Sequence, residues 1–162
     1  MSFFTMQLVV RLITSALGSC SFALIFKTHK RHLLLLSISG LITYFVYYTV
    51  GFFGGGFFLA SFASTVFAAA FGELCARLCH APAIIYLLTG LIPIVPGGEA
   101  YYTMRYFLER NMSMAMDKFF ATVGVALGIA GGIVLVSLIF GVMTDRLAQK
   151  RNAGAEGANG KR

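Results

Sequence analysis

The chain has 162 residues, of which 58% are hydrophobic and 12% are charged, and its formal net charge is +7. Soluble domains carry roughly 45–50% apolar and about 25% charged residues, so the composition excludes an ordinary soluble domain and indicates one membrane domain. The basic residues stand at the ends of apolar segments rather than on one surface. They are therefore expected to set membrane topology and not to bind nucleic acid.

Five long apolar segments predict an all-α integral membrane protein, a bundle of about five transmembrane helices. A helix needs roughly 20 apolar residues to cross a bilayer. The predicted transmembrane domain covers residues 1–145, with spans at 3–26, 33–50, 57–79, 83–105 and 119–143. Residues 146–162 are polar and basic and contain several Gly, Ala and Asn residues, which predicts a disordered cytoplasmic tail.

The lysine and arginine residues indicate the orientation of these spans. If the basic loop at 27–32, Arg77 and the tail share one side of the membrane, only Arg105, Arg110 and Lys118 lie on the other. Basic residues accumulate on the cytoplasmic side. The expected arrangement is a multi-pass membrane protein with its N-terminus outside and its C-terminus in the cytoplasm.

Small residues recur every four positions in the third and fifth spans. A side chain at every fourth position lies on one helix face, and small side chains there let two helices approach closely. The predicted packing residues are Ala60, Ser64, Ala68 and Gly72 in the third span and Gly124, Gly128 and Gly132 in the fifth. The pattern indicates close packing without identifying which helices meet.

The fourth span contains Leu91–Tyr102, which holds two of the three prolines, a Gly-Gly pair and a carboxylate. Proline removes a backbone donor and clashes with the preceding turn, so a helix breaks there. In lipid, a broken helix is tolerated only where it is buried in protein or lines a wet cavity. We therefore predict a substrate pathway at the break. Its candidate residues are Pro93, Pro96, Gly97, Gly98, Glu99, Tyr101 and Arg11.

Two interpretations of Glu99 follow from its position where the helix restarts. Free N–H groups and the helix dipole favour an anion at this point, and a substrate carboxylate is one candidate. In the second interpretation, the carboxylate of Glu99 in the first helical turn is itself the anion that complements the dipole.

Arg11 is expected at a membrane depth similar to that of Glu99. A lone charge in lipid costs roughly 2.5–3.5 kcal/mol on insertion scales, so we predict an ion pair between Arg11 and Glu99. The alternative is that the Arg11 side chain extends outward to the membrane surface.

The remaining polar residues indicate neither an enzyme nor a metal site. Glu73 precedes Arg77 by four residues, which predicts an ion pair on a helix surface. Cys75, Cys79 and His80 lack a fourth ligand for zinc, so no metal and no cofactor are expected. We find neither a nucleophile with a paired base nor a nucleotide-binding loop, so transport would be driven by ion or substrate gradients.

The pattern Ile92-Pro93-x-x-Pro96-Gly97-x-x-Ala100-Tyr101-x-x-Met104 resembles the signature of the threonine/serine exporter family. The chain is most similar to the short type, in which the C-terminal half is a separate small subunit, and its length, five segments and Gly-rich last span agree. The resemblance implies a subunit of a secondary transporter that exports threonine and serine or small dicarboxylates such as succinate. Gly98 and Glu99 fall where the signature has no fixed residue, so it assigns them no role.

The resemblance also implies a second five-span subunit as partner, besides membrane lipid and a small carboxylate substrate. Two similar halves with five spans each would lie in opposite orientations, as in transporters built from inverted repeats. The alternative function is a non-transporting structural or assembly subunit of a membrane complex. The small-residue patterns suit both functions, whereas the broken polar segment favours transport.

Overall fold

The structure is a computed structural model that describes residues 2–26, 28, 30–79 and 82–159, and every regular element in these ranges is helical. The elements are α1 (Ser2–Ile25), α2 (Lys30–Phe52), α3 (Gly56–Cys79), α4 (Ala83–Leu91), the 3-10 helix η1 (Ile92–Ile94), α5 (Gly97–Leu108) and α6 (Met112–Asn159). Among the described residues, four helices are long and apolar enough to cross a membrane. The pair Ala83–Ile94 and Gly97–Leu108, bent by 46°, makes a fifth candidate span. The predicted all-α membrane bundle is confirmed.

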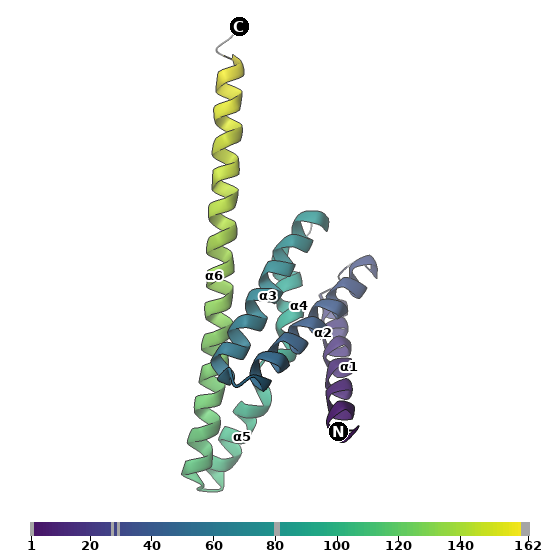
Figure 1. Cartoon of the computed structure of the whole chain (residues 1–162), viewed down its shortest axis with the longest axis vertical. Helices are drawn as coiled ribbons and strands as arrows, with labels where there is room; N and C mark the ends of the chain where they lie inside the picture. Colours follow the sequence, from purple (N-terminus) through teal and green to yellow (C-terminus); the bar gives the residue numbers. More distant parts are fainter. Residues whose placement is uncertain (1, 27, 29, 80–81, 160–162) are drawn as a thin grey trace.

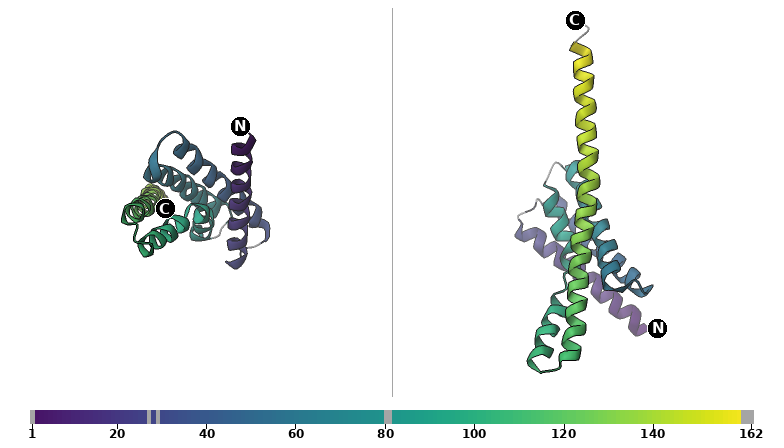
Figure 2. Two further views of the ribbon diagram at one scale, coloured as in Figure 1. Left: turned by 90° about the horizontal axis from the view of Figure 1, so that it is seen from below. Right: turned by 90° about the vertical axis from the view of Figure 1, so that its left-hand side faces the viewer.

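The helices form an open, layered bundle around α3 (Figures 1 and 2). Helix α3 packs against α2, α4 and α6, whereas α1 packs mainly against α2. Helices α1 and α6 lie at opposite edges of the bundle (Figure 1). The α5–α6 hairpin extends beyond the α2–α3 turn, and the C-terminal part of α6 extends away from the bundle at the other end (Figures 1 and 2).

The α2–α3 turn is built from glycine. Gly54 and Gly56 have φ values of +82° and +65°. Glycine adopts positive φ at little cost because it has no Cβ. The turn therefore reverses the chain within four residues and places α2 and α3 side by side.

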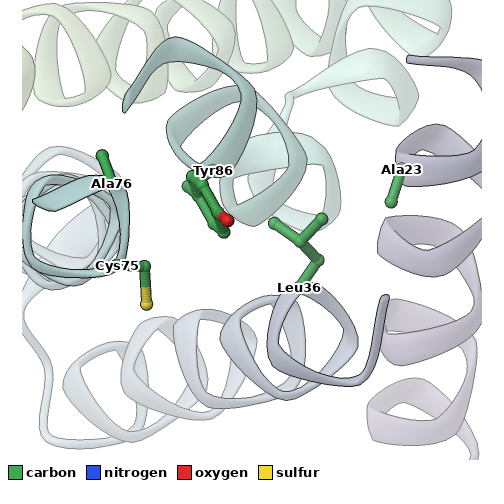
Figure 3. Packing of buried hydrophobic residues seen from close by; sticks show 5 residues of the cluster. All are labelled: Ala23, Leu36, Cys75, Ala76 and Tyr86. Carbon is green, nitrogen blue, oxygen red and sulfur yellow. The ribbon is translucent and has the colours of Figure 1, made fainter. Parts of the chain in front are cut away.

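The side chain of Tyr86 fills the space between α1, α2, α3 and α4. It is 1% exposed and packs with Ala23, Leu36, Cys75 and Ala76 (Figure 3). Four helices each contribute to this cluster, so it joins α4, which leads into the break, to the first three helices.

Small residues pack α3 against two different neighbours. A Cβ added at Gly90 of α4 would lie 3.5 Å from the Cβ of Ala68, and one added at Gly72 would lie 3.1 Å from the backbone nitrogen of Leu87. Ala60, Ser64, Ala68 and Gly72 are all buried. The face of α3 that carries Ala68 and Gly72 thus meets α4.

A second face of α3 receives α6. A Cβ at Gly128 would lie 2.6 Å from the carbonyl oxygen of Phe58, and one at Gly132 would lie 2.8 Å from the Cβ of Thr65. Gly124 is looser, because a Cβ there would come no closer than 3.8 Å to α3. The two later glycines therefore mark the closest approach of α6 to α3.

The α5–α6 turn is shorter than the gap between the predicted spans. Those spans leave residues 106–118 between them, whereas α5 ends at Leu108 and α6 begins at Met112. Arg110 takes a left-handed conformation with φ of +58°, and the Asn111 side chain accepts a hydrogen bond of 3.3 Å from the backbone N–H of Met114. Asparagine is a favoured residue before the first helical turn because it satisfies such an orphan donor.

Helix α6 runs into the C-terminal segment and ends at Asn159. The disordered tail expected at 146–162 stays a prediction. The stretch at 147–151 consists of leucine, alanine, glutamine, lysine and arginine, which are all strong helix formers, and no proline follows to end the helix. Residues 160–162 lie outside the described part.

Candidate functional site

The chain breaks between α4 and α5 at two prolines. Pro93 lies at the start of η1, and Pro96 immediately precedes α5. Each proline lacks an N–H group, so neither continues the helical hydrogen bonding. Val95 has an extended backbone with φ of −60° and ψ of +127°, and its N–H donates to the carbonyl of Ile92 at 3.4 Å. The bend of 46° follows from this extended residue between two helical segments.

One groove lies along the break on the side of α5 and α6. Its volume is about 160 Å³, and it is lined by Tyr47, Pro93, Ile94, Val95, Pro96, Gly98, Glu99 and Val125. Four of the predicted pathway residues are therefore together here: Pro93, Pro96, Gly98 and Glu99. Gly97 is exposed and a Cβ there would meet nothing within 4 Å. Tyr101 is 64% exposed and is not among the residues that line this groove.

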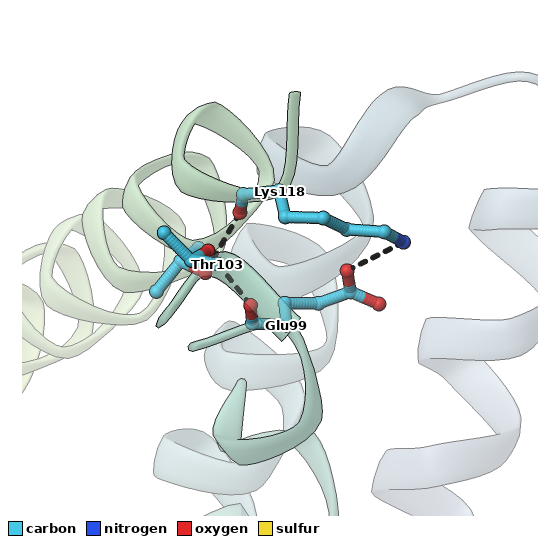
Figure 4. Close-up of polar contacts among 4 residues, drawn as sticks. Glu99, Thr103 and Lys118 are labelled. Carbon is cyan, nitrogen blue, oxygen red and sulfur yellow. Dashed lines mark hydrogen bonds and ion pairs between the residues drawn. The ribbon is translucent and has the colours of Figure 1, made fainter. Parts of the chain in front are cut away.

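Glu99 forms an ion pair with Lys118 of α6. The Nζ of Lys118 lies 2.8 Å from the Oε2 of Glu99 (Figure 4). Two threonine hydroxyls reinforce the same turns: Thr103 donates to the carbonyl of Glu99, and Thr122 donates to that of Lys118, at 2.8 and 2.9 Å. The pair therefore ties the first turn of α5 to α6.

The predicted ion pair between Arg11 and Glu99 is wrong. The sequence argument paired two charges by their depth, but the tight turn at Arg110 places Lys118 beside Glu99 instead. Within the described part of the chain, no carboxylate lies within 4.0 Å of Arg11. Its guanidinium lies within hydrogen-bonding reach of the Tyr44 hydroxyl on α2.

A second groove, with a volume of about 300 Å³, contains Arg11. It is lined by Arg11, Thr14 and Ser15 of α1, Tyr44 of α2 and Pro93. Pro93 lines both grooves, so the break separates a groove with a cation and hydroxyl groups from a groove lined by the Glu99 carboxylate. Tyr44 and Tyr47, whose ring centroids are 6.3 Å apart, line one groove each.

The other predicted polar contacts lie away from the break. Arg77 Nε lies 4.0 Å from Glu73 Oε2, which confirms the expected surface pair at the outer limit of such contacts. The Arg77 guanidinium also lies 5.0 Å from the ring centroid of Phe140. Cys75 and Cys79 carry free thiols, and His80, the third residue considered for a metal, lies outside the described residues.

Sequence reasoning missed three side chains of the groove around Arg11, and it missed the partner of Glu99. Thr14 and Ser15 follow Arg11 by three and four residues, so helical spacing alone places them on its face. The partner of Glu99 had a weaker signal: Asn111 as a helix cap predicts a tight turn, which folds Lys118 back toward Glu99. Tyr44 had no such signal, because nothing in the sequence shows how α1 crosses α2.

An all-helical bundle of candidate spans with a broken, charged segment defines a multi-pass membrane protein. In agreement, the family model described as "Threonine/Serine exporter, ThrE" matches residues 11–139. The chain belongs to the threonine/serine exporter family, and the family suggested by the Pro-x-x-Pro-Gly signature is confirmed. No curated protein and no solved structure matches the chain.

Proposed function

We propose that this chain is one subunit of a secondary transporter that exports small carboxylated metabolites. The observation that carries the proposal is the break at Pro93 and Pro96, with a groove on each side and ionisable side chains in both. Irregular backbone and charged residues at membrane depth are expensive, and transporters use both to bind substrates. Family membership favours threonine or serine as the substrate, and small dicarboxylates such as succinate are the second candidate.

We further propose that the chain works with a second five-span subunit in a prokaryotic plasma membrane, with its N-terminus outside. The open shape of the bundle supports this, because α1 and α6 lie at opposite edges and leave broad faces for another subunit (Figure 1). Five crossings place the two halves in opposite orientations. An impermeant thiol reagent tests the orientation: with the three native cysteines replaced, a cysteine at position 110 should react from outside the cell and one at position 152 should not.

Transport is tested in proteoliposomes with labelled threonine, serine and succinate. The chain is assayed alone, with the second subunit, and with the second subunit carrying Pro96→Ala or Glu99→Gln in this chain. Gly124→Ala serves as the control, because a Cβ there makes only ordinary contacts. Transport that needs both subunits and falls at least tenfold with Pro96→Ala, but not with Gly124→Ala, is the expected result. Transport rates that are the same with Pro96→Ala or Glu99→Gln as with the wild-type chain would favour a structural or assembly subunit.

A further inference from the structure

The groove around Arg11 contains a charge without a counter-ion. Arg11 lies in the candidate span Leu8–Ile25, and no described carboxylate approaches it within 4.0 Å. Arg11 stands in the first turn of that span, and its guanidinium is within hydrogen-bonding reach of a neutral group, the Tyr44 hydroxyl. A guanidinium beside a hydroxyl but with no carboxylate partner keeps its full positive charge, and an anion is the ligand that this charge favours.

The hydrogen-bonding groups in this groove are divided into donors and acceptors. Arg11 has only donors, and the Tyr44 hydroxyl lies beside its guanidinium. The Thr14 hydroxyl donates to the carbonyls of Val10 and Arg11 at 3.0 Å, and the Ser15 hydroxyl donates to that of Leu12 at 2.8 Å. Because their protons are already engaged, the oxygens of Thr14 and Ser15 remain available in this groove as hydrogen-bond acceptors.

We propose that this groove binds the zwitterionic head of an amino acid. Arg11 binds the carboxylate, with Tyr44 holding the guanidinium in place, and the oxygens of Thr14 and Ser15 accept hydrogen bonds from the ammonium group. Pro93 closes the groove toward the break and leaves the chain there without an N–H group. The volume of about 300 Å³ lies at the small end of ligand sites, which suits a molecule of the size of serine or threonine.

The same division of groups disfavours a dicarboxylate. A second carboxylate would meet the acceptor oxygens of Thr14 and Ser15 and would find no second cation among the residues that line the groove. Lys118 does not line this groove, and its ammonium group is paired with Glu99. The inference rests on the proposed transport function and assigns named side chains to the carboxylate and the ammonium group of its substrate.

Competition binding tests this assignment on the two-subunit complex in proteoliposomes, with labelled L-serine as the probe. Serinol lacks the carboxylate, 3-hydroxypropionate lacks the ammonium group, and succinate replaces it with a second carboxylate. Each is expected to bind the wild-type complex more weakly than serine, by roughly 10- to 150-fold, which corresponds to one lost charged hydrogen bond. Equal affinity for serine and succinate would overturn the assignment.

Two sets of variants separate the carboxylate subsite from the ammonium subsite. Arg11→Gln should weaken serine to the level of serinol and leave serinol itself unchanged, which a general loss of structure would not do. The double change Thr14→Val with Ser15→Ala should instead weaken serine to the level of 3-hydroxypropionate. Arg110→Gln, at an exposed arginine of the α5–α6 turn, is the matched control and should bind all four ligands as the wild type does.

The outcomes distinguish this inference from the proposed function. If the complex transports serine and Arg11→Gln binds it with unchanged affinity, Arg11 is not the carboxylate subsite and the transport function stands. If Arg11→Gln weakens serine and serinol equally, Arg11 has only a structural role and the assignment also fails. A wild-type complex that moves none of the labelled substrates would refute the transport function itself.

Discussion

The contact between α6 and α3 makes a quantitative prediction at Gly128. A Cβ there would lie 2.6 Å from the carbonyl oxygen of Phe58 and 3.0 Å from the backbone nitrogen of Phe62, besides meeting the Ser61 hydroxyl. A rotamer change relieves a clash with a side chain but not one with backbone atoms. Gly128→Ala therefore forces α6 away from α3. Gly124→Ala is the matched control, because its nearest contact would be 3.8 Å.

The comparison of these two substitutions isolates the cost of the clash. Both replace glycine by alanine within one helix, which favours the helix by about 1 kcal/mol. Only Gly128→Ala adds overpacking, which typically costs about 1–3 kcal/mol. We therefore expect Gly128→Ala to have a free energy of unfolding about 1–3 kcal/mol lower than that of Gly124→Ala.

Unfolding is followed by titration of the full chain with sodium dodecyl sulfate in mixed micelles. The chain has no tryptophan and seven tyrosines, so loss of helix by circular dichroism and tyrosine fluorescence are the two signals. Gly132→Ala should behave like Gly128→Ala, because a Cβ there would lie 2.8 Å from two carbons of Thr65. Equal unfolding midpoints for Gly124→Ala and Gly128→Ala would show that α6 does not approach α3 this closely.

The same titration tests the Glu99–Lys118 ion pair, the α5–α6 turn and the buried Thr65 hydroxyl. A double-mutant cycle with Glu99→Gln and Lys118→Gln should give a coupling of about 0.2–1 kcal/mol, because the two side chains are 32% and 37% exposed, and zero coupling would contradict the ion pair. Arg110→Gly should stabilise the chain by about 1 kcal/mol by relieving a left-handed residue, whereas Asn111→Ala should destabilise it by about 1 kcal/mol through loss of the helix cap. Thr65→Val should leave stability unchanged or raise it, because the Thr65 hydroxyl is buried without a hydrogen-bond partner among the residues that the structure describes, and a clear loss would reveal a partner.

The sequence predicts the fold class and the break well because both depend on local chemistry. Long apolar runs need no knowledge of neighbours to be recognised as membrane helices, and Pro93 and Pro96 interrupt a helix wherever they occur. The i, i+4 pair of Glu73 and Arg77 is local in the same way.

The sequence does not predict which side chains meet across helices. The regular spacing of small residues in α3 suggests one packing face, yet Ala68 meets α4 while Thr65, three residues earlier, meets α6. The partner of Glu99 was misassigned for a related reason. Lys118 is nineteen positions away along the chain, and it reaches Glu99 only because the turn at Arg110 is tight.

Different helix contacts position Arg11 and Glu99, the charged residues of the two grooves that Pro93 lines. The Arg11 groove is built by α1 and α2, whereas Glu99 is tied through Lys118 to α6, which packs against α3 at Gly128. The two sets of contacts meet at the bent segment, where the extended Val95 joins η1 to α5. Gly128→Ala should therefore lower the stability of the chain and leave the preference for serine over serinol unchanged, whereas Arg11→Gln should abolish that preference with little effect on the contact between α3 and α6. A loss of ligand discrimination in Gly128→Ala would mean that the two grooves are coupled through the break and that α6 helps to shape the groove around Arg11.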